Sequence, residues 1–422
     1  TMLSKIAICT AALAIGLPAL GGPVHFYRDA DGAALKEQGA TAETFGLTDD
    51  QLNALYEATG GKVDLRHFYR VDAATKSTGH FDQFASAGVS DNSVPPPVIK
   101  TDSLDPELDG QWWIEDLNTA GVWDLATGAG VTIADCDAGY YIDEPDLVPN
   151  LLLDYRYDVA DEDDPLIIND GNFITHGTSV AAIMLGAKDG VGTNGIAYDA
   201  KLVPLQNFNY NSSLDDMDKE VATAKCILKA IENPDVKIVV LENQTAEGSS
   251  ETFEGTREAV ELAMAAGVTV VSAGGNYSRE LTIEQEHDTG SIIVGALAQD
   301  GSMAYFSNYG ERITISAFGE KLRTLRGPDG TMGDFGGTSG ATPQVAAAVA
   351  LMLEVNPNLT PLEIRDLLVQ TRVPREDTDR VGGRLDVMAA VQAAAATPPN
   401  VAKSNDQADL RKRVIEILGQ RG

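Results

Sequence analysis

The chain has 422 residues and is 43% hydrophobic, so it can bury a large core and form more than one domain. Its 31 basic and 63 acidic residues give a formal net charge of -32 at pH 7. Nucleic acid and anionic membranes are therefore poor partners for this protein, and cationic partners are favoured.

The first residues predict export. Lys5 precedes an apolar run at Ile6–Leu20, and the small residues Gly21 and Gly22 follow it, as in a secretory signal. A membrane-spanning helix needs roughly 20 apolar residues, which is longer than this run. We therefore interpret residues 1–22 as a signal peptide that is removed, leaving a secreted protein, extracellular or periplasmic, with no stable membrane insertion.

Residues 23–105 differ in composition from the rest of the chain. A helix is predicted after Thr48, a residue type that caps helices, and before Gly60 and Gly61, which end it. A polar segment then leads to Pro95–Pro97, which has the composition of a linker.

From Gln111 onward, short apolar runs alternate with amphipathic helices, which predicts a parallel sheet with crossover helices. We assign residues 106–396 to this main domain and residues 397–422 to a linker and a short amphipathic helix. The basic run Arg411–Arg413 would suit a membrane surface, but we expect the helix to pack on the main domain. The apolar side of that helix consists of Leu410, Val414, Ile417 and Leu418.

Two cysteines, Cys136 and Cys226, remain after the predicted signal cleavage. Cys136 falls in a predicted buried strand and Cys226 in a predicted helix. We favour two inert, buried thiols, because free cysteine commonly behaves as a small buried hydrophobe. A disulfide between them is the alternative.

Ser339 is the candidate nucleophile. Gln344–Leu353 has no polar residue after the first, which predicts a helix buried on all sides. Ser339 stands at the start of this helix, where unpaired amides and the positive end of the dipole favour developing negative charge. The alternative is an ordinary helix N-cap.

His176 is the candidate base. From Gln111 to the end, the only histidines are His176 and His287. We expect His287 in a solvated loop, because the run Glu284–Asp288 is charged, whereas His176 precedes a second apolar helix at Val180–Leu185. If Ser339 has an imidazole base, His176 is the one that fits.

Acidic and amide side chains follow two predicted strands. Val131–Asp137 ends in two acids, Asp135 and Asp137, and Gly267–Ala273 leads to Asn276. Parallel sheets bind ligands at the carboxyl ends of their strands. A carboxylate there would orient an imidazole, and Asn276 would donate to an oxyanion. Turn formation is the structural alternative.

The order Asp, His, Asn, Ser resembles the subtilisin-like serine peptidase family from about Gln111 to Ala395. Gly337–Pro343 resembles its nucleophile motif and His176–Thr178 its histidine motif; residues 194–200, 306–310 and 359–361 also resemble stretches of it. The α/β-hydrolases are excluded, because their serine comes first in the chain within Gly-x-Ser-x-Gly, whereas Ser339 comes last and Ala341 replaces the final glycine of that motif.

The resemblance implies an α/β fold of three layers, with a mostly parallel seven-stranded sheet and helices on both faces. It implies that Ser339 is the nucleophile, His176 the general base and then acid, and an Asp the group that orients it. Asn276 and the Ser339 backbone amide would hold the oxyanion, with no cofactor required for catalysis. The substrate would be a polypeptide. Residues 23–105 would be a pro-region that inhibits its own enzyme and is removed by autocatalytic cleavage between about Gly88 and Gly110.

Two acids compete for the orienting role. Residues two apart in a strand point the same way, so periodicity alone leaves Asp135 and Asp137 equivalent. In the family the acid precedes the proline of Pro-Asp-Leu by eight positions, and here that proline is Pro145, which selects Asp137. Repulsion between two acids on one face predicts a raised pKa for Asp135.

The chain departs from the family at several positions. Asp135 stands where an apolar residue is usual, and the substrate-binding edge strand reads Leu241–Ala246 in place of Ser-Leu-Gly-Gly. Further departures are Ala138, Glu144 and Gly274. They motivate an alternative function, that of a non-catalytic, acidic extracellular binding protein on a peptidase scaffold.

The segment Asp158–Asp164 places five carboxylates in one loop. We favour a solvated acidic loop, because runs of charge usually form one. A structural calcium site is the alternative, because calcium prefers oxygen ligands from flexible loops.

Overall fold

A computed structural model describes residues 26–28, 34–39, 47–63, 65, 69–71, 110–159, 174–190, 192–207, 216–327, 330–375 and 378–419. The predicted signal peptide, the proline linker, the expected processing region from Gly88 to 109 and most of the acidic segment Asp158–Asp164 lie outside these residues.

The predicted parallel sheet is confirmed. Seven strands pair in the order β10-β9-β8-β7-β4-β6-β5, and every pairing between them is parallel. Their apolar residues form near-continuous runs, as expected where both faces of a parallel sheet are covered. The strands are β4 (Thr132–Asp137), β5 (Tyr157–Asp158), β6 (Lys201–Gln206), β7 (Val236–Leu241), β8 (Thr269–Ala273), β9 (Ile292–Leu297) and β10 (Ile315–Phe318).

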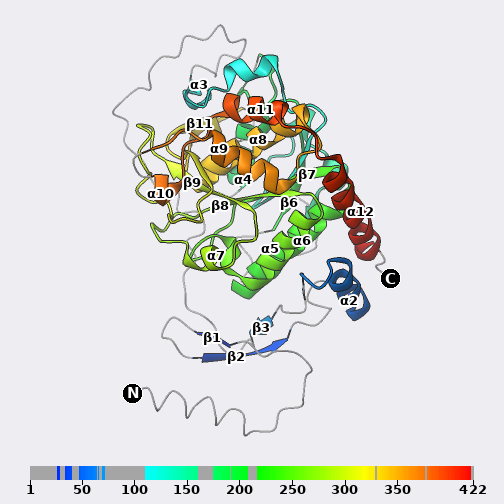
Figure 1. Cartoon of the computed structure of the whole chain (residues 1–422). Coiled ribbons are helices and arrows are strands. Elements are labelled where there is room, and N and C mark those ends of the chain that lie inside the picture. The colour runs from blue at the N-terminus through cyan, green and yellow to red at the C-terminus, as the bar shows by residue number, and fades with distance from the viewer. Residues whose placement is uncertain are drawn as a thin grey trace, which may run out of the picture.

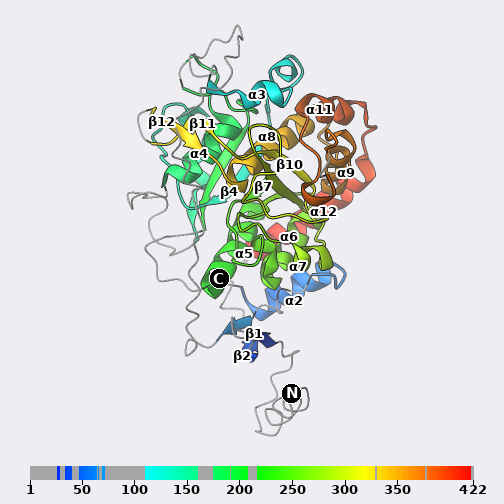
Figure 2. The same cartoon turned by 90° about the vertical axis from the view of Figure 1, so that its left-hand side faces the viewer.

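Helices cover both faces of this sheet, which gives the three predicted layers (Figures 1 and 2). One face packs against α4 (Ile174–Leu185) and α8 (Thr338–Val355) and contributes Ile133 and Val240 to that core. The other face packs against α5 (Asp216–Glu232) and α6 (Glu254–Ala265) and contributes Ala134 and Val239. Successive strand residues therefore face opposite layers, as the two-residue period of a strand requires.

Shorter elements complete the main domain. They are α3 (Trp113–Asp116), α7 (Thr282–Glu286), α9 (Pro361–Thr371), α10 (Thr378–Val381), α11 (Val387–Ala396), the antiparallel pair β11 (Leu322–Leu325) and β12 (Met332–Phe335), and four 3-10 turns at 120–124, 148–150, 153–155 and 250–252.

The expectation of two free thiols is wrong. Cys136 of β4 and Cys226 of α5 form a disulfide, with an S–S distance of 1.99 Å and a Cα–Cα distance of 6.2 Å. Strand alternation turns Cys136 toward the face that α5 covers, and both cysteines belong to the same buried cluster. Cys136 lies in a strand and Cys226 in a helix, as expected, but the two residues are still neighbours because α5 packs directly on β4.

The helix predicted after Thr48 is present as α2 (Asp49–Ala58). The Thr48 hydroxyl accepts from the Gln51 amide, and the Gln51 side chain accepts from the Thr48 amide, forming a capping box. In the same N-terminal segment, β1 (Phe26–Arg28), β2 (Ala34–Gly39) and β3 (Tyr69–Val71) form an antiparallel sheet.

The C-terminal helix packs on the body of the protein, as expected, but α12 (Val401–Leu418) has 18 residues and is longer than the short helix predicted. Val414 and Leu418 join the core beneath α5 and α6, and α12 also contacts α2, where the Gln51 side chain donates to the Ile417 carbonyl at 2.7 Å. Arg411 is buried and donates to the Asn233 and Val236 carbonyls, so it fastens the helix to the start of β7. Among the described residues, no helix has the length and apolar character needed to cross a bilayer.

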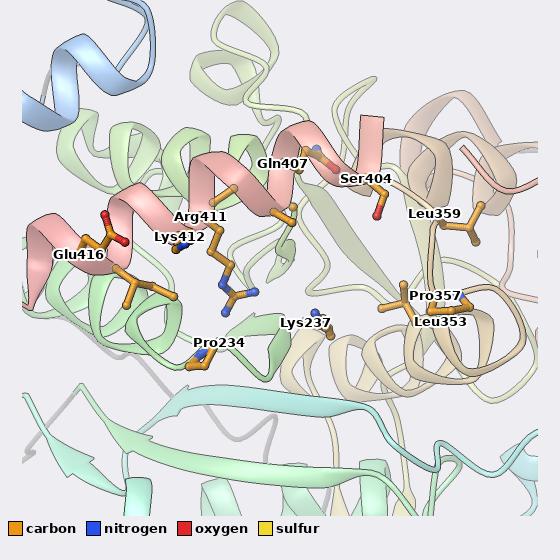
Figure 3. Close-up of a pocket in the computed structure, with 14 residues that line it drawn as sticks. Pro234, Lys237, Leu353, Pro357, Leu359, Ser404, Gln407, Arg411, Lys412 and Glu416 are labelled. Atoms are coloured by element: carbon orange, nitrogen blue, oxygen red, sulfur yellow. The ribbon is translucent and has the colours of Figure 1, made fainter. Parts of the chain in front are cut away.

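A pocket of about 410 Å³ lies between α12 and the body, as Figure 3 shows. Lys237 at the start of β7 and Gly267 before β8 line it, so it lies at the amino edge of the sheet. The candidate residues for catalysis lie at the carboxyl edge, on the opposite side.

Candidate active site

The candidate residues meet at the carboxyl edge of three neighbouring strands. β4 ends at Asp137, β7 ends at Leu241 and β8 ends at Ala273, three residues before Asn276. In the sheet order, β7 lies between β4 and β8. Because these strands are parallel, their ends share one edge, where ligands of such sheets bind.

Asp137 holds the His176 imidazole. The Nδ1 atom of His176 lies 2.7 Å from Asp137 Oδ1 and 2.9 Å from Oδ2. Both residues are buried, with exposed fractions of 7% for His176 and 1% for Asp137. The Phe335 ring meets the imidazole edge-on, with 5.2 Å between ring centroids. Nδ1 is thus occupied by a carboxylate, which leaves Nε2 to act on a proton.

Asp135 is fully buried, and neither of its carboxylate oxygens has a hydrogen-bond partner among the described residues. The expected rise in its pKa is present. Burial is the leading cause, and the charge of Asp137 adds to it. Repulsion, the cause expected from the sequence, is therefore secondary to the removal of this carboxyl from water.

Ser339 lies in the first turn of α8 and is 5% exposed. All residues from Thr338 to Leu353 are buried, as the apolar pattern predicted. Gly337 precedes the helix with φ +84°, a conformation that glycine adopts readily, and a Cβ there would lie 3.3 Å from Asn276 Nδ2. The chain thereby brings the positive end of the helix dipole to the serine hydroxyl.

Asn276 is fixed beside the nucleophile by Thr338. Its Oδ1 accepts from the Thr338 amide at 2.8 Å and from the Thr338 hydroxyl at 3.1 Å. The acceptor end of the amide is therefore occupied, and Nδ2 has no hydrogen-bond partner within the described parts of the chain. That group is free to donate to a charge that develops next to Ser339.

Two further residues hold the Asn276 loop, and sequence reasoning missed their role. Gln244 accepts from the Asn276 backbone amide at 2.5 Å. Asn308 accepts from the Tyr277 and Arg279 amides and donates to the Gly274 carbonyl at 2.8 Å. Asn308 stood in a stretch that resembles the family, and Gln244 in the altered edge strand, but neither pattern specifies a partner far along the chain.

The described residues contain no group of three or more His, Cys, Asp or Glu side chains arranged to hold a metal ion. Of the acidic segment proposed for calcium, only Asp158 and Val159 are described. The favoured solvated loop and the alternative calcium site therefore both stay predictions.

The parallel sheet with its two helical layers, and the candidate catalytic residues at its carboxyl edge, together define an α/β protein of the subtilisin-like class. The sequence matches the subtilase family over residues 128–401, and the chain belongs to this family of serine peptidases.

Two proteins similar to this chain are proteases. An extracellular protease of Xanthomonas campestris pv. campestris is 30% identical over 307 residues, which cover 63% of this chain and 52% of the relative. The chain thus spans about half the length of that relative. An intracellular serine protease of Paenibacillus polymyxa is 29% identical, over 69% of this chain and 88% of its own length.

Solved structures of similar fold include a protease from Pseudoalteromonas arctica PAMC 21717. Its TM-score with this chain is 0.59 at 27% identity, and the match covers 70% of this chain and 100% of that one. The seven-stranded sheet and its two helical layers are therefore those of subtilisin-like proteases.

Proposed function

We propose that the protein is a secreted serine endopeptidase in which Ser339 is the nucleophile, His176 the general base, and Asp137 the orienting acid. The observation that carries this proposal is the bidentate contact between the His176 Nδ1 atom and the Asp137 carboxylate. A buried acid on Nδ1 stabilises the tautomer whose Nε2 accepts a proton and the cation that then forms.

The chemistry follows from these positions. Ser339 Oγ attacks the carbonyl carbon of a peptide bond while its proton passes to His176 Nε2. The carbonyl oxygen becomes an oxyanion, which the Asn276 Nδ2 group and the Ser339 amide stabilise. His176 then gives its proton to the leaving amine, the C–N bond breaks, and water releases the acyl group by the same steps in reverse order.

The alternative is a non-catalytic extracellular binding protein, which the altered edge strand Leu241–Ala246 favours. A fluorophosphonate probe separates the two functions, because it forms a covalent bond only with an activated serine. Labelling of the wild type that disappears in Ser339→Ala supports the peptidase. A folded, processed wild type that takes up no label supports the binding protein.

Secretion is supported by the signal-like residues 1–22 and by the disulfide, because disulfides persist mainly in oxidising compartments. The extracellular relative agrees with export, although the Paenibacillus relative is intracellular. Terminal sequencing of exported Ser339→Ala, which should keep residues 23–105, tests the cut near Gly21. Recovery of the full chain from the cytoplasm alone would contradict export.

The N-terminal residues 23–105 are proposed to act as a pro-region that inhibits the enzyme until it is cut away. The expected cleavage lies between about Gly88 and Gly110 and is carried out by the enzyme itself. Purified Ser339→Ala should therefore keep the longer form, while the wild type matures. Maturation of Ser339→Ala to the same N-terminus in a purified preparation would exclude self-processing.

A further inference from the structure

Glu242 occupies the centre of the candidate active site. It follows directly on β7, the strand between β4, which carries Asp137, and β8, which leads to Asn276. The register pairs Cys136 with Leu241, so the next pair along the two strands is Asp137 with Glu242. In parallel strands such partners lie side by side and point to the same face.

That face is the one covered by α4 and α8. Val240, two residues before Glu242, packs into the core beneath these helices, whereas Leu241 packs on the opposite side against α5 and α6. Alternation therefore turns Glu242 toward the layer whose helices carry His176 and Ser339. The Ser339 hydroxyl lowers the pKa of this carboxyl in part, so the two groups influence each other electrostatically without a hydrogen bond between them.

The surroundings of Glu242 disfavour its charge. The residue is 1% exposed, and neither of its carboxyl oxygens has a hydrogen-bond partner or an ion pair among the described residues. The titratable groups that act on it are Asp135 and Asp137 of β4 and Tyr140 of the turn that follows. Two of these are acids, and no lysine or arginine of the described chain is paired with it.

Burial raises the pKa of Glu242 well above its ordinary value, and the charges of Asp135 and Asp137 raise it further, while the Ser339 hydroxyl lowers it in part. Catalysis requires Asp137 to be ionised, because its charge stabilises the imidazolium. A second negative charge next to it, away from water, would be strongly unfavourable.

We propose that Glu242 is a positioning residue for Ser339, acting as a neutral carboxylic acid whose O–H donates to the serine Oγ. This proposal rests on the proposed function. In the proposed reaction the Ser339 O–H donates to His176 Nε2, so the hydroxyl would be held between a donor and a base. When the proton moves to His176 and the Oγ–C bond forms, the Glu242 O–H stays on its own oxygen and no proton leaves it. An ionised Glu242 would instead accept the serine proton and add negative charge beside the oxyanion.

The test is the rate of labelling by a fluorophosphonate as a function of pH, measured on mature wild type, Glu242→Gln, Glu242→Leu and Ser339→Ala. Gln keeps a donor of the same shape and never ionises, whereas Leu keeps the volume without a donor. The matched control is Glu261→Gln, because Glu261 is an acid of α6, on the sheet face opposite α8, and burial also raises its pKa, to about 7.

We expect the wild-type rate to fall at alkaline pH, with this fall absent in Glu242→Gln and unchanged in Glu261→Gln. At neutral pH, Glu242→Gln should stay within about threefold of wild type and Glu242→Leu should be about tenfold slower or more, the value of one lost hydrogen bond to a reacting group. Thermal unfolding confirms that each variant is folded.

Three results overturn the proposal. Equal rates and pH profiles for wild type, Glu242→Gln and folded Glu242→Leu would leave Glu242 with a packing role only. If Glu242→Gln is inactive at every pH, the reaction needs the ionised carboxylate of Glu242 and not its neutral acid. A wild type that labels no faster than Ser339→Ala would refute the proposed peptidase itself, and the role of Glu242 with it.

Discussion

The choice of orienting acid gives the sharpest test of the site. Asp137→Asn replaces a carboxylate that lies 2.7 and 2.9 Å from His176 Nδ1 with an amide of the same shape. Asn can meet Nδ1 with its oxygen or its NH₂ group, and the second arrangement favours the tautomer with the proton on Nε2. That tautomer cannot accept the Ser339 proton. Other serine-peptidase triads lose on the order of ten-thousand-fold in turnover from this change, or about 5 kcal/mol of transition-state stabilisation.

Asp135→Asn is the matched control, because Asp135 lies two residues earlier in the same strand, points to the same face and is equally buried. Its carboxyl makes no hydrogen bond to the imidazole, and its raised pKa favours a neutral group that Asn mimics. We expect a loss of less than about tenfold, the scale of a buried contact without a role in proton transfer.

The assay is kcat on a fluorogenic casein, with processed protein and with active serines counted by fluorophosphonate titration. Because self-processing is itself proposed to need the site, slow variants are matured by adding a trace of wild type, which is then removed by an affinity tag. If folded Asp135→Asn is the inactive variant and Asp137→Asn turns over near the wild-type rate, the assignment is wrong and Asp135 orients the histidine.

Three further predictions concern stability. Removal of the disulfide by Cys136→Ala with Cys226→Ala should lower the free energy of unfolding, measured in urea, by about 2–4 kcal/mol. Unfolded wild type should show no free thiol at these positions before reduction. An unchanged unfolding midpoint in the double variant would contradict the cross-link. Because the folded pKa of Asp135 lies above its ordinary value of 3.8, the unfolded state loses its proton first, and wild-type stability should fall as pH rises from about 4 toward the raised pKa; Asp135→Asn should flatten this fall, and parallel curves would refute the argument. If the segment Asp158–Asp164 binds calcium, EDTA should lower the Tm relative to added calcium, whereas equal Tm values would leave a solvated loop.

Local and periodic features of the sequence predicted the fold well. The alternation of apolar runs with helices predicted the parallel sheet, the apolar stretch Gln344–Leu353 predicted a fully buried helix, and Thr48 predicted a cap that is present in α2. The spacing from Pro145 also selected Asp137, the acid that contacts His176. Each of these signals depends on residues that are close together in the chain, or on a spacing inherited with the family.

Features that depend on tertiary packing were missed. The bridge between Cys136 and Cys226 needs α5 to lie across β4, and no periodicity specifies which helix covers which strand. Glu242 was read only as a departure from the usual edge strand, because its nearness to Asp135 and Ser339 follows from the order in which β4 and β7 pair. The hydrogen bond from the Thr338 amide to Asn276 likewise joins residues 62 positions apart.

If the protein is the peptidase proposed above, the disulfide affects how it responds to cleavage by other copies of itself. Cys136 and Cys226 are 90 residues apart, and the segment between them carries Asp137 and His176. A single peptide-bond cut anywhere within that segment leaves both fragments covalently joined. The buried core on either side of the sheet can then keep the nicked fragments in register. Self-cleavage in this part of the chain would therefore give two fragments on a denaturing gel only after reduction of the disulfide. Asp137 and His176 would stay within one covalently joined molecule after the cut.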